Sequence, residues 1–363
     1  MTTEAEFTID NPWRGQGMPG FDPKGVSVNV AAPLELLKLC PAAKATPLVA
    51  CPDLAKAQGI ARLDIKDESQ RMNLGSFKAL GAAYAIAKQA AAKRQSDHDD
   101  QNADWSEVLS DEVYITSSAG NHGLSVAAGA RLFGAKAVIY LSKHVPADFA
   151  ERLRGYGAEV VIAGDSYEDS MDAALARAKA EGWQIMSDTT WPECYTGVDI
   201  MEGYLVMAAE AFDALDQPPT HIFLQAGVGG LAAAVAALAR DYYGDAPHIT
   251  VVEPSEAPAL QVAIKAGKVI SSGGDVSIMG RLDCKEASEV ALAGLAAHAD
   301  AFMTISDAEC KRLIAELAAA GLAGSASGAA GYAALKLAKA KGLYGLNDQS
   351  RVLLFLSEGA IDD

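Results

Sequence analysis

The stretch THIFLQAGVGGLAAAVAALARDYYG, residues 220–244, decides the fold because a glycine-rich turn joins two kinds of element within it. Its first part is a short apolar run of the kind found in buried strands, and its alanine-rich second part is typical of a helix. A strand that leads directly into a helix is the start of a strand–helix–strand unit, from which parallel sheets are built. The stretch therefore predicts an α/β fold.

The same alternation continues along the chain. Further short runs rich in Val, Ile and Leu are separated mostly by helical segments, and these runs lie at residues 61–68, 112–118, 135–142, 158–164, 184–188, 248–254 and 350–359. Strands that alternate with helices form parallel sheets covered by helices on both faces. We therefore expect an α/β protein with two domains, whose parallel-rich twisted sheets are flanked by helices. A polar segment at residues 91–107 is expected to be an exposed connection.

Length, charge and cysteine usage restrict the possible functions. The chain has 363 residues, enough for two domains, and a formal net charge of -17. Nucleic acids and anionic membranes are bound through clustered Lys and Arg, so this acidic balance argues against both partners. The five cysteines form no C-x-x-C pair, which predicts reduced thiols rather than a disulfide or zinc framework. Without a membrane-length apolar run or a signal-peptide pattern, we expect a cytoplasmic protein.

One lysine has unusual surroundings. In LGSFKALGAAYAI, residues 74–86, Lys78 follows Phe77 and precedes a run of small, helix-compatible residues. A lysine packed against apolar side chains has a depressed pKa and can act as a nucleophilic amine. A lone lysine on an amphipathic segment is more often solvated, so this segment alone leaves both interpretations open.

Three strand ends carry candidate binding residues, since ligands of open α/β sheets lie beyond the carboxyl ends of the strands. TSSAGNHGLS, residues 116–125, offers the amide of Asn121 and the N–H groups of a helix start. QAGVGGLAA, residues 225–233, can form a nest of N–H donors for one phosphate, without the Lys-Ser/Thr ending of a nucleotide P-loop. The last strand offers the hydroxyl of Ser357. Each segment could also be an ordinary turn.

In combination these features suit pyridoxal 5′-phosphate. The lysine amine suits the aldehyde of the cofactor, and the glycine nest suits its single phosphate. The Asn amide and the strand-end hydroxyl suit its ring hydroxyl and its pyridine nitrogen. The glycine-rich segment contains no carboxylate that could hold magnesium, so we expect no metal.

Five motifs, in this order, resemble the fold-type II pyridoxal phosphate enzymes: KDESQRMNLGSFKALGAAYA, SSAGNHG, SDTTWPECY, QAGVGG and LSEGAID. The resemblance begins near residue 46, and the patterns D-E-S-x-R and D-T-x-W favour the diaminopropionate ammonia-lyase branch. It implies β-elimination from a small L-amino acid, giving a 2-oxo acid and ammonia, in a homodimer. It also implies a smaller domain at residues 91–199, inserted into a larger cofactor-binding domain of residues 1–90 and 200–363.

The resemblance further implies a role for each matching residue. Lys78 would hold the cofactor as a Schiff base and move protons. Asp188 would be the base for the L-isomer, although an aspartate at this place could also cap a helix. The other expected cofactor-binding residues are Phe77, Asn121, Gly227, Val228, Gly229, Gly230 and Ser357. The candidates for substrate binding are Ser117, Ser118, Ala119, Asn121 and Arg71. For Arg71 we favour a structural ion pair with Asp67 or Glu68.

The chain departs from the pattern of this branch at three places. Ala119 stands where the diaminopropionate ammonia-lyases carry an aspartate associated with the D-isomer, which puts activity on D-substrates in doubt. Ala326 stands where they tend to carry a glutamate, and residues 191–203 look shorter than in these enzymes. The substrate therefore stays open. A 3-hydroxy amino acid dehydratase, a β-replacement synthase and a non-catalytic binding protein on the same fold are the alternatives.

Overall fold

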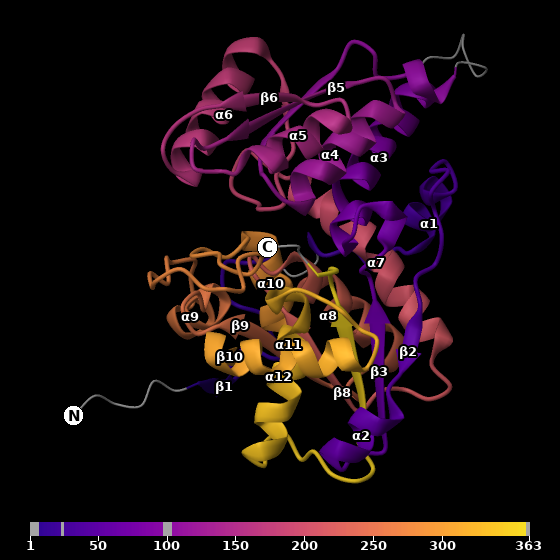
Figure 1. Ribbon diagram of the computed structural model, residues 1–363, viewed down its shortest axis with the longest axis vertical. Coiled ribbons are helices and arrows are strands. Elements are labelled where there is room, and N and C mark those ends of the chain that lie inside the picture. The colour runs from indigo at the N-terminus through magenta and orange to yellow at the C-terminus, as the bar shows by residue number, and fades with distance from the viewer. Residues whose placement is uncertain (1–6, 23–24, 97–103, 361–363) are drawn as a thin grey trace.

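The computed structural model describes residues 7–22, 25–96 and 104–360, which form two lobes, each built on its own sheet (Figure 1). In the larger lobe the strand order is β1-β10-β9-β8-β11-β3-β2. The five central strands are parallel, whereas β1 and β2 pair antiparallel at the two edges. The bounds are β1 (Thr8–Asp10), β2 (Leu48–Ala50), β3 (Arg62–Asp67), β8 (His221–Gln225), β9 (His248–Pro254), β10 (Ala301–Ile305) and β11 (Arg351–Leu356).

Helices cover both faces of this sheet, because its central strands are apolar on both sides. Along β8, Ile222 and Leu224 pack into one core cluster and Phe223 packs into another. The first cluster includes buried residues of α3 (Gly81–Ser96), α7 (Thr196–Ala214), α8 (Gly230–Tyr243), α9 (Ala259–Ala266) and α10 (Glu289–His298). The second cluster includes those of α2 (Pro52–Gln58), α11 (Asp307–Ala319) and α12 (Ala326–Ala340).

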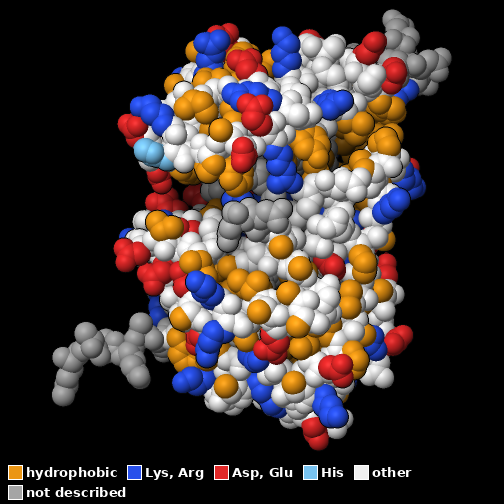
Figure 2. All heavy atoms as spheres, viewed as in Figure 1, with side chains coloured by type: hydrophobic (Ala, Val, Ile, Leu, Met, Phe, Trp, Pro, Cys, Tyr) orange, Lys and Arg blue, Asp and Glu red, His pale blue; other side chains and the backbone are white. Residues whose placement is uncertain are grey.

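The smaller lobe has a four-stranded parallel sheet in the order β6-β5-β4-β7. Its elements are β4 (Val113–Ser117), α4 (Asn121–Leu132), β5 (Lys136–Leu141), α5 (Ala147–Gly155), β6 (Glu159–Ile162), α6 (Tyr167–Glu181) and β7 (Gln184–Ile185). Helix α1 (Ala31–Leu37) lies beside α3 and α7, where the lobes meet (Figure 1). The space-filling view shows charges of both signs scattered over this face and a recess between the lobes (Figure 2).

Small residues bring the helices at this junction close together. A Cβ atom on Gly129 of α4 would lie 2.8 Å from the Cα of Ala83 in α3, and one on Gly203 of α7 would lie 2.2 Å from the carbonyl oxygen of Leu80. No side chain fits at either place. The two glycines therefore allow α4 and α7 to hold the segment that carries Lys78 from both sides.

The α/β class with parallel-rich, helix-flanked sheets is confirmed, and each apolar run identified in the sequence contains a strand. Strands β1, β2 and β10 were not predicted. The expected exposed connection at residues 91–107 is wrong in its first part, because residues 91–96 are the last turns of α3. Residues 97–103 lie outside the described residues. Within the described residues, no helix has the length and apolar character needed to cross a membrane.

Candidate active site

The segment that carries Lys78 lies at the carboxyl end of β11. It is a short 3-10 helix, Phe77–Leu80, capped by Ser76, whose Oγ accepts a hydrogen bond from the Lys78 backbone N–H at 3.0 Å. The Phe77 N–H donates to the carbonyl oxygen of Ser357 at 3.0 Å. These bonds place the predicted Schiff-base lysine directly beside the predicted strand-end serine.

The Lys78 ammonium donates a hydrogen bond to the Asp188 carboxylate and forms an ion pair with it. Its Nζ atom lies 5.5 Å from the centre of the Phe77 ring and 5.9 Å from that of Tyr204. Burial acts to lower the pKa of Lys78, but the nearby Asp188 carboxylate raises it above that of a free lysine. The depressed pKa expected from the apolar neighbours is therefore wrong, because the sequence could not show that Asp188 lies against the amine.

Asp188 follows β7, and its loop is tied to the larger lobe. The Ser187 N–H donates to Thr196 Oγ1 at 3.1 Å, and the Thr190 N–H donates to Ser288 Oγ at 3.1 Å. Burial acts to raise the pKa of Asp188, but the charge of Lys78 holds it well below its usual range. Among the described contacts, its carboxylate caps no helix and instead accepts from Lys78.

The glycine-rich turn between β8 and α8 leaves the N-terminus of α8 without a side-chain cap. Gly229 has a φ of 105°, a conformation that other residues rarely adopt. A Cβ atom on Gly227 would lie 2.9 Å from the Sγ of Cys284. Gly227 therefore lets the turn lie close to Cys284. Because no side chain caps the start of α8, its backbone N–H groups can bind an anionic group.

Asn121 is the first residue of α4, and its side chain connects the smaller lobe to the end of the chain. Its Nδ2 donates to Oε2 of Glu358 at 2.5 Å, and the other carboxylate oxygen of Glu358 accepts from Ser325 Oγ. Ser118 Oγ accepts from the Gly120 N–H at 3.3 Å. Ser117 is buried and hydrogen-bonded to Ser170 Oγ at 2.8 Å, so its hydroxyl is already engaged.

Ser357 is 4% exposed, and its hydroxyl accepts a hydrogen bond from Nε2 of Gln225 at 3.1 Å. The same Gln225 amide donates to the carbonyl oxygen of Phe355 at 2.7 Å. This arrangement leaves the proton of the Ser357 hydroxyl free to donate to a ring nitrogen.

Arg71 belongs to a buried charge cluster rather than to the substrate region. It is 0% exposed and bonded to both oxygens of Glu68, at 2.7 and 2.8 Å, and to Glu210. Lys66 donates to the same Glu210 carboxylate at 2.6 Å. The pairing with Glu68 favoured from the sequence is present, so we assign Arg71 no contact with substrate.

Sequence reasoning missed two buried groups near Lys78. The hydroxyl of Tyr204 and the Nδ1 atom of His122 are buried and have no hydrogen-bond partner among the described residues. Burial raises the pKa of Tyr204 to about 12 and lowers the pKa of His122, so both are uncharged at neutral pH. His122 appeared in the Asn-loop motif, but no motif pointed to Tyr204, which comes from the middle of α7.

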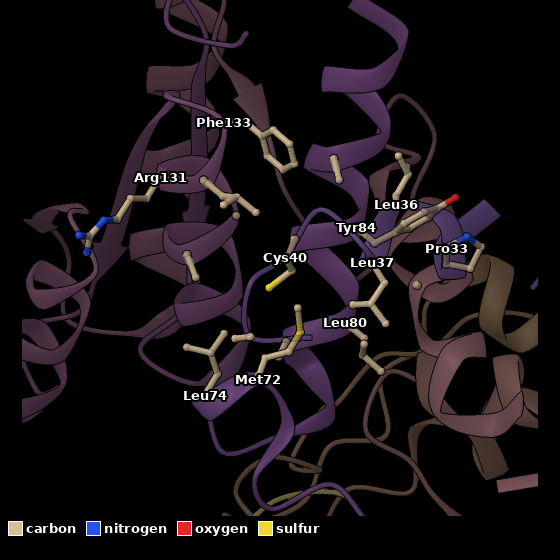
Figure 3. Close-up of a pocket in the computed structure, with 18 of the residues that line it drawn as sticks. Pro33, Leu36, Leu37, Cys40, Met72, Leu74, Leu80, Tyr84, Arg131 and Phe133 are labelled. Carbon is tan, nitrogen blue, oxygen red and sulfur yellow. The ribbon is translucent and has the colours of Figure 1, made fainter. Parts of the chain in front are cut away.

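A separate apolar pocket of about 430 Å³ lies between α1, α3 and α4 (Figure 3). Apolar side chains such as Leu36, Leu37 and Phe133 line it, and the Arg131 side chain points away from its centre. The lining includes Ala79 and Leu80, which follow Lys78, but no residue of the Asn loop or the glycine-rich turn. It is therefore distinct from the site built around Lys78.

Residues 39–358 match the family model described as pyridoxal-phosphate dependent enzyme. The chain belongs to this family. The residues around Lys78 fit the cofactor, because the glycine-rich turn leaves a cradle for its phosphate. Asn121 and Ser357 offer donors for its ring, and Lys78 offers an amine. Among the described residues, no group of three or more His, Cys, Asp and Glu side chains could hold a metal ion.

Curated relatives of this pyridoxal-phosphate enzyme include diaminopropionate ammonia-lyases. The Escherichia coli K12 enzyme is 35% identical over 250 residues, which cover 66% of this chain and 63% of that enzyme. The match thus spans slightly less than two thirds of the E. coli enzyme. The Salmonella typhimurium enzyme is 34% identical over 281 residues, covering 72% of this chain and 69% of that enzyme.

A solved structure supports the fold assignment over nearly the whole chain. Diaminopropionate ammonia lyase from Escherichia coli, in complex with an aminoacrylate-PLP azomethine reaction intermediate, superposes with a TM-score of 0.84 at 28% identity. The superposition covers 97% of this chain and 93% of that one. The architecture of this chain is therefore that of the fold-type II pyridoxal phosphate enzymes.

Proposed function

We propose that this protein is a pyridoxal phosphate-dependent carbon–nitrogen lyase that eliminates the β-substituent of a small L-amino acid. The products are a 2-oxo acid and ammonia, and 2,3-diaminopropionate is the first substrate to test. The observation that carries the proposal is the Lys78–Asp188 ion pair between the glycine-rich turn and the Asn loop. The similarity to diaminopropionate ammonia-lyases supports the choice of reaction.

The cofactor supplies an electron sink that makes the α-proton of a bound amino acid acidic. Ser357 would hold its ring nitrogen through a neutral hydroxyl, and Asn121 would hold its ring hydroxyl. The N–H groups of Gly227, Val228, Gly229 and Gly230 would hold its phosphate. Ser118 and the N-terminus of α4 are the strongest candidates for the substrate α-carboxylate. Ser117 contributes less, because its hydroxyl is engaged by Ser170.

Asp188 takes the α-proton of the L-isomer in this scheme. Burial acts to raise its pKa, and the positive charge of Lys78 is the largest effect that opposes burial, ahead of that of His122. When the Lys78 amine becomes neutral, burial dominates and Asp188 becomes a stronger base. Asp188 then passes the α-proton to the neutral Lys78 amine through the hydrogen bond between them, and the resulting ammonium delivers that proton to the leaving group at the β-carbon. In the overall reaction, 2,3-diaminopropionate and one water give pyruvate and two molecules of ammonia.

The division into two domains is part of the proposal. Strands β4 to β7 fall inside the expected insert, residues 91–199, whereas α3 crosses its first boundary. The smaller domain carries the Asn loop, so closing it on the substrate would exclude water from the site. Crystals with and without substrate test this, because identical orientations of the two lobes would contradict closure.

The decisive experiment measures pyruvate and ammonia with L- and D-2,3-diaminopropionate. The holoenzyme should yield both products from the L-isomer. Lys78→Ala should lose the cofactor absorption band and at least about 100-fold in turnover. Lys38→Ala is the control, because Lys38 is a surface lysine paired with Glu35. A cofactor band without product would redirect the search to dehydration or β-replacement, and no band would remove the lysine assignment.

The proposed enzyme is a homodimer that works in the cytoplasm. The apolar side chains of the pocket between α1, α3 and α4 offer a surface that a second copy could cover. All five cysteines are free thiols, as expected in a reducing compartment. Light scattering during size-exclusion chromatography should give twice the chain mass, and a monomer would contradict this part of the proposal.

A further inference from the structure

Arg281 is a cation at the candidate active site that the proposed reaction does not use. It lies in the connection between α9 and α10, and its side chain is 35% exposed. Its guanidinium lies over Gly120, the residue before Asn121, within 3.3 Å of where a Cβ atom would be. The carbonyl oxygen of Arg281 lies 3.2 Å from the corresponding position on Gly227. Arg281 thus extends from the glycine-rich turn to the Asn loop, and the proposed substrate lies between these two segments.

The guanidinium of Arg281 has unused hydrogen-bonding capacity. Among the described residues, the nearest carboxylate is that of Glu358, whose Oε2 lies 3.9 Å from Nε, too far for a hydrogen bond. Both oxygens of Glu358 already accept bonds from Asn121 and Ser325. Glu358 therefore balances part of the charge but leaves the N–H donors of Arg281 available to a ligand.

The backbone holds Arg281 in place. Its own N–H donates to Ser327 Oγ at 3.1 Å, and Ser327 is buried in the first turn of α12. Further along the same connection, Lys285 donates to Asp283 at 2.6 Å and to the carbonyl oxygen of Glu256 at 3.0 Å. The backbone is thus fixed on both sides of Arg281, which lowers the entropy cost of binding a ligand through its guanidinium.

We infer that Arg281 selects substrates that carry a second carboxylate on the β-carbon. Arg binds carboxylates through paired N–H donors, and Ser118 and the start of α4 already serve the α-carboxylate. The terminal amine of 2,3-diaminopropionate is cationic and would be repelled by a guanidinium. The inference rests on the proposed β-elimination and adds a preference within it: 2-amino-3-substituted butanedioates should react better than substrates without a β-carboxylate, such as 2,3-diaminopropionate.

The reaction balances with such a substrate. From 3-hydroxyaspartate the α-hydrogen and the β-hydroxyl leave as water, and hydrolysis of the resulting enamine consumes one water. The products are oxaloacetate and ammonia, and no oxidant or reductant is needed.

Two matched pairs of ligands test this inference. L-Serine and L-3-hydroxyaspartate, the latter as both diastereomers, share the leaving group and differ in the β-carboxylate. L-Alanine and L-aspartate differ in the same group and have no leaving group at the β-carbon. For the holoenzyme, kcat/KM is measured with the first pair and the dissociation constant with the second, by calorimetry. The variants are Arg281→Gln, Arg281→Lys and the surface control Arg154→Gln, whose side chain pairs with Glu151.

The wild type should favour each dicarboxylate by at least about 10-fold. Arg281→Gln should remove that preference, mainly through KM, while serine and alanine change less than about twofold. Arg281→Lys should keep part of the preference, and Arg154→Gln should keep all of it. If Arg281→Gln weakens kcat/KM or binding equally for both members of a pair, Arg281 contacts the α-carboxylate. If the variant changes neither quantity, Arg281 has a structural role. Either result overturns the inference.

Calorimetry with L-alanine and L-aspartate distinguishes failure of this inference from failure of the proposed function. If no amino acid is turned over but L-aspartate binds more tightly than L-alanine through Arg281, the recognition holds and the lyase activity fails. If L-2,3-diaminopropionate is turned over and neither dicarboxylate is preferred, the activity holds and the recognition fails.

Discussion

The side-chain amide of Asn121 donates to Glu358 at 2.5 Å and thereby joins the first turn of α4 to the end of the chain after β11. An amide nitrogen has two hydrogens, so Asn121 can hold Glu358 with one and the cofactor ring hydroxyl with the other. Glu358 therefore orients the residue that we propose contacts the ring, although no sequence pattern assigned it that task.

Removing the Glu358 carboxylate should weaken cofactor binding. In Glu358→Ala the Asn121 amide loses its partner, and the dissociation constant for pyridoxal 5′-phosphate should rise by at least about 10-fold. Glu358→Gln keeps an acceptor for Asn121 and should restore most of the affinity. Titrating the apo protein with cofactor and following absorbance measures both. Equal affinity in all three proteins would show that Glu358 does not position Asn121.

Replacing Asp188 by Asn should lower kcat by at least about 100-fold and change the dependence of stability on pH. Folding lowers the pKa of Asp188. Its ion pair therefore stabilises the folded protein at pH values above about 3.9, the pKa of Asp in the unfolded chain, and this stabilisation is lost as the pH falls below that value. The pKa of Lys78 is raised, so its contribution is lost only above about pH 10.4.

The Tm difference between the apo forms of wild type and Asp188→Asn should therefore shrink below about pH 4, where Asp188 takes up a proton. It should also shrink as the pH rises towards about 10.4, because without Asp188 burial lowers the pKa of Lys78 in the variant. Differential scanning fluorimetry across this range measures it. A difference that grows as the pH falls below about 4 would contradict the ion pair.

Gly227→Ala should impair cofactor binding selectively. The added methyl group would lie 2.9 Å from the Sγ of Cys284 and 3.2 Å from the carbonyl oxygen of Arg281, so the glycine-rich turn must shift. Such overpacking predicts at least about a 10-fold loss of cofactor affinity. Gly155→Ala is the matched control, because a Cβ atom there meets nothing within 4 Å. Similar affinities for the two variants would remove Gly227 from the phosphate site.

The residue at position 119 should decide which isomer reacts. The Asn loop of this chain has no carboxylate, so the wild type should process D-2,3-diaminopropionate at least about 100-fold more slowly than the L-isomer. Ala119→Asp should gain activity on the D-isomer, whereas Ala119→Asn, of similar size but without a base, should not. Comparable rates of the wild type with both isomers would reject this explanation.

Arg71→Leu should destabilise the protein without changing substrate affinity. It leaves the buried carboxylates of Glu68 and Glu210 with Lys66 as their nearest cation, a loss of about 3–5 kcal/mol in the free energy of unfolding. Arg154→Leu, at an exposed ion pair, should cost less than about 1 kcal/mol. Urea unfolding measures both. A rise in KM with unchanged stability would return Arg71 to the substrate site.

Most of the strands that the sequence predicted contain a continuous apolar run. Strands β5, β9 and β11 are largely buried and rich in Val, Ile and Leu, whereas in β3 Leu63 and Ile65 alternate with charged residues. Strands β1 and β2 have three residues each, too few for a periodic signal. Strand β10, Ala301–Ile305, is fully buried but directly follows an alanine-rich helix, which obscured its start.

The sequence indicated those candidate site residues that lie in local motifs. Lys78 and Gly227 belong to short segments whose composition already points to chemistry. Tyr204 and Arg281 have no such neighbours, and Glu358 lies in the motif LSEGAID, to which only Ser357 had been assigned a role. They reach the site because α7, β11 and the connection before α10 converge there. The raised pKa of Lys78 could not be foreseen for the same reason, since Asp188 is 110 positions away.

The loop of Asp188 leaves the smaller sheet after β7, yet Thr190 is bonded to Ser288 at the start of α10 in the larger lobe. A rotation of the smaller lobe would therefore move Asn121, on α4, more than it moves Asp188. The distance between Asp188 and Lys78 would stay nearly constant while the Asn loop, the proposed site of the substrate carboxylate, changes position. Substitutions in the Asn loop could then change the substrate specificity without changing the geometry of proton transfer between Asp188 and Lys78.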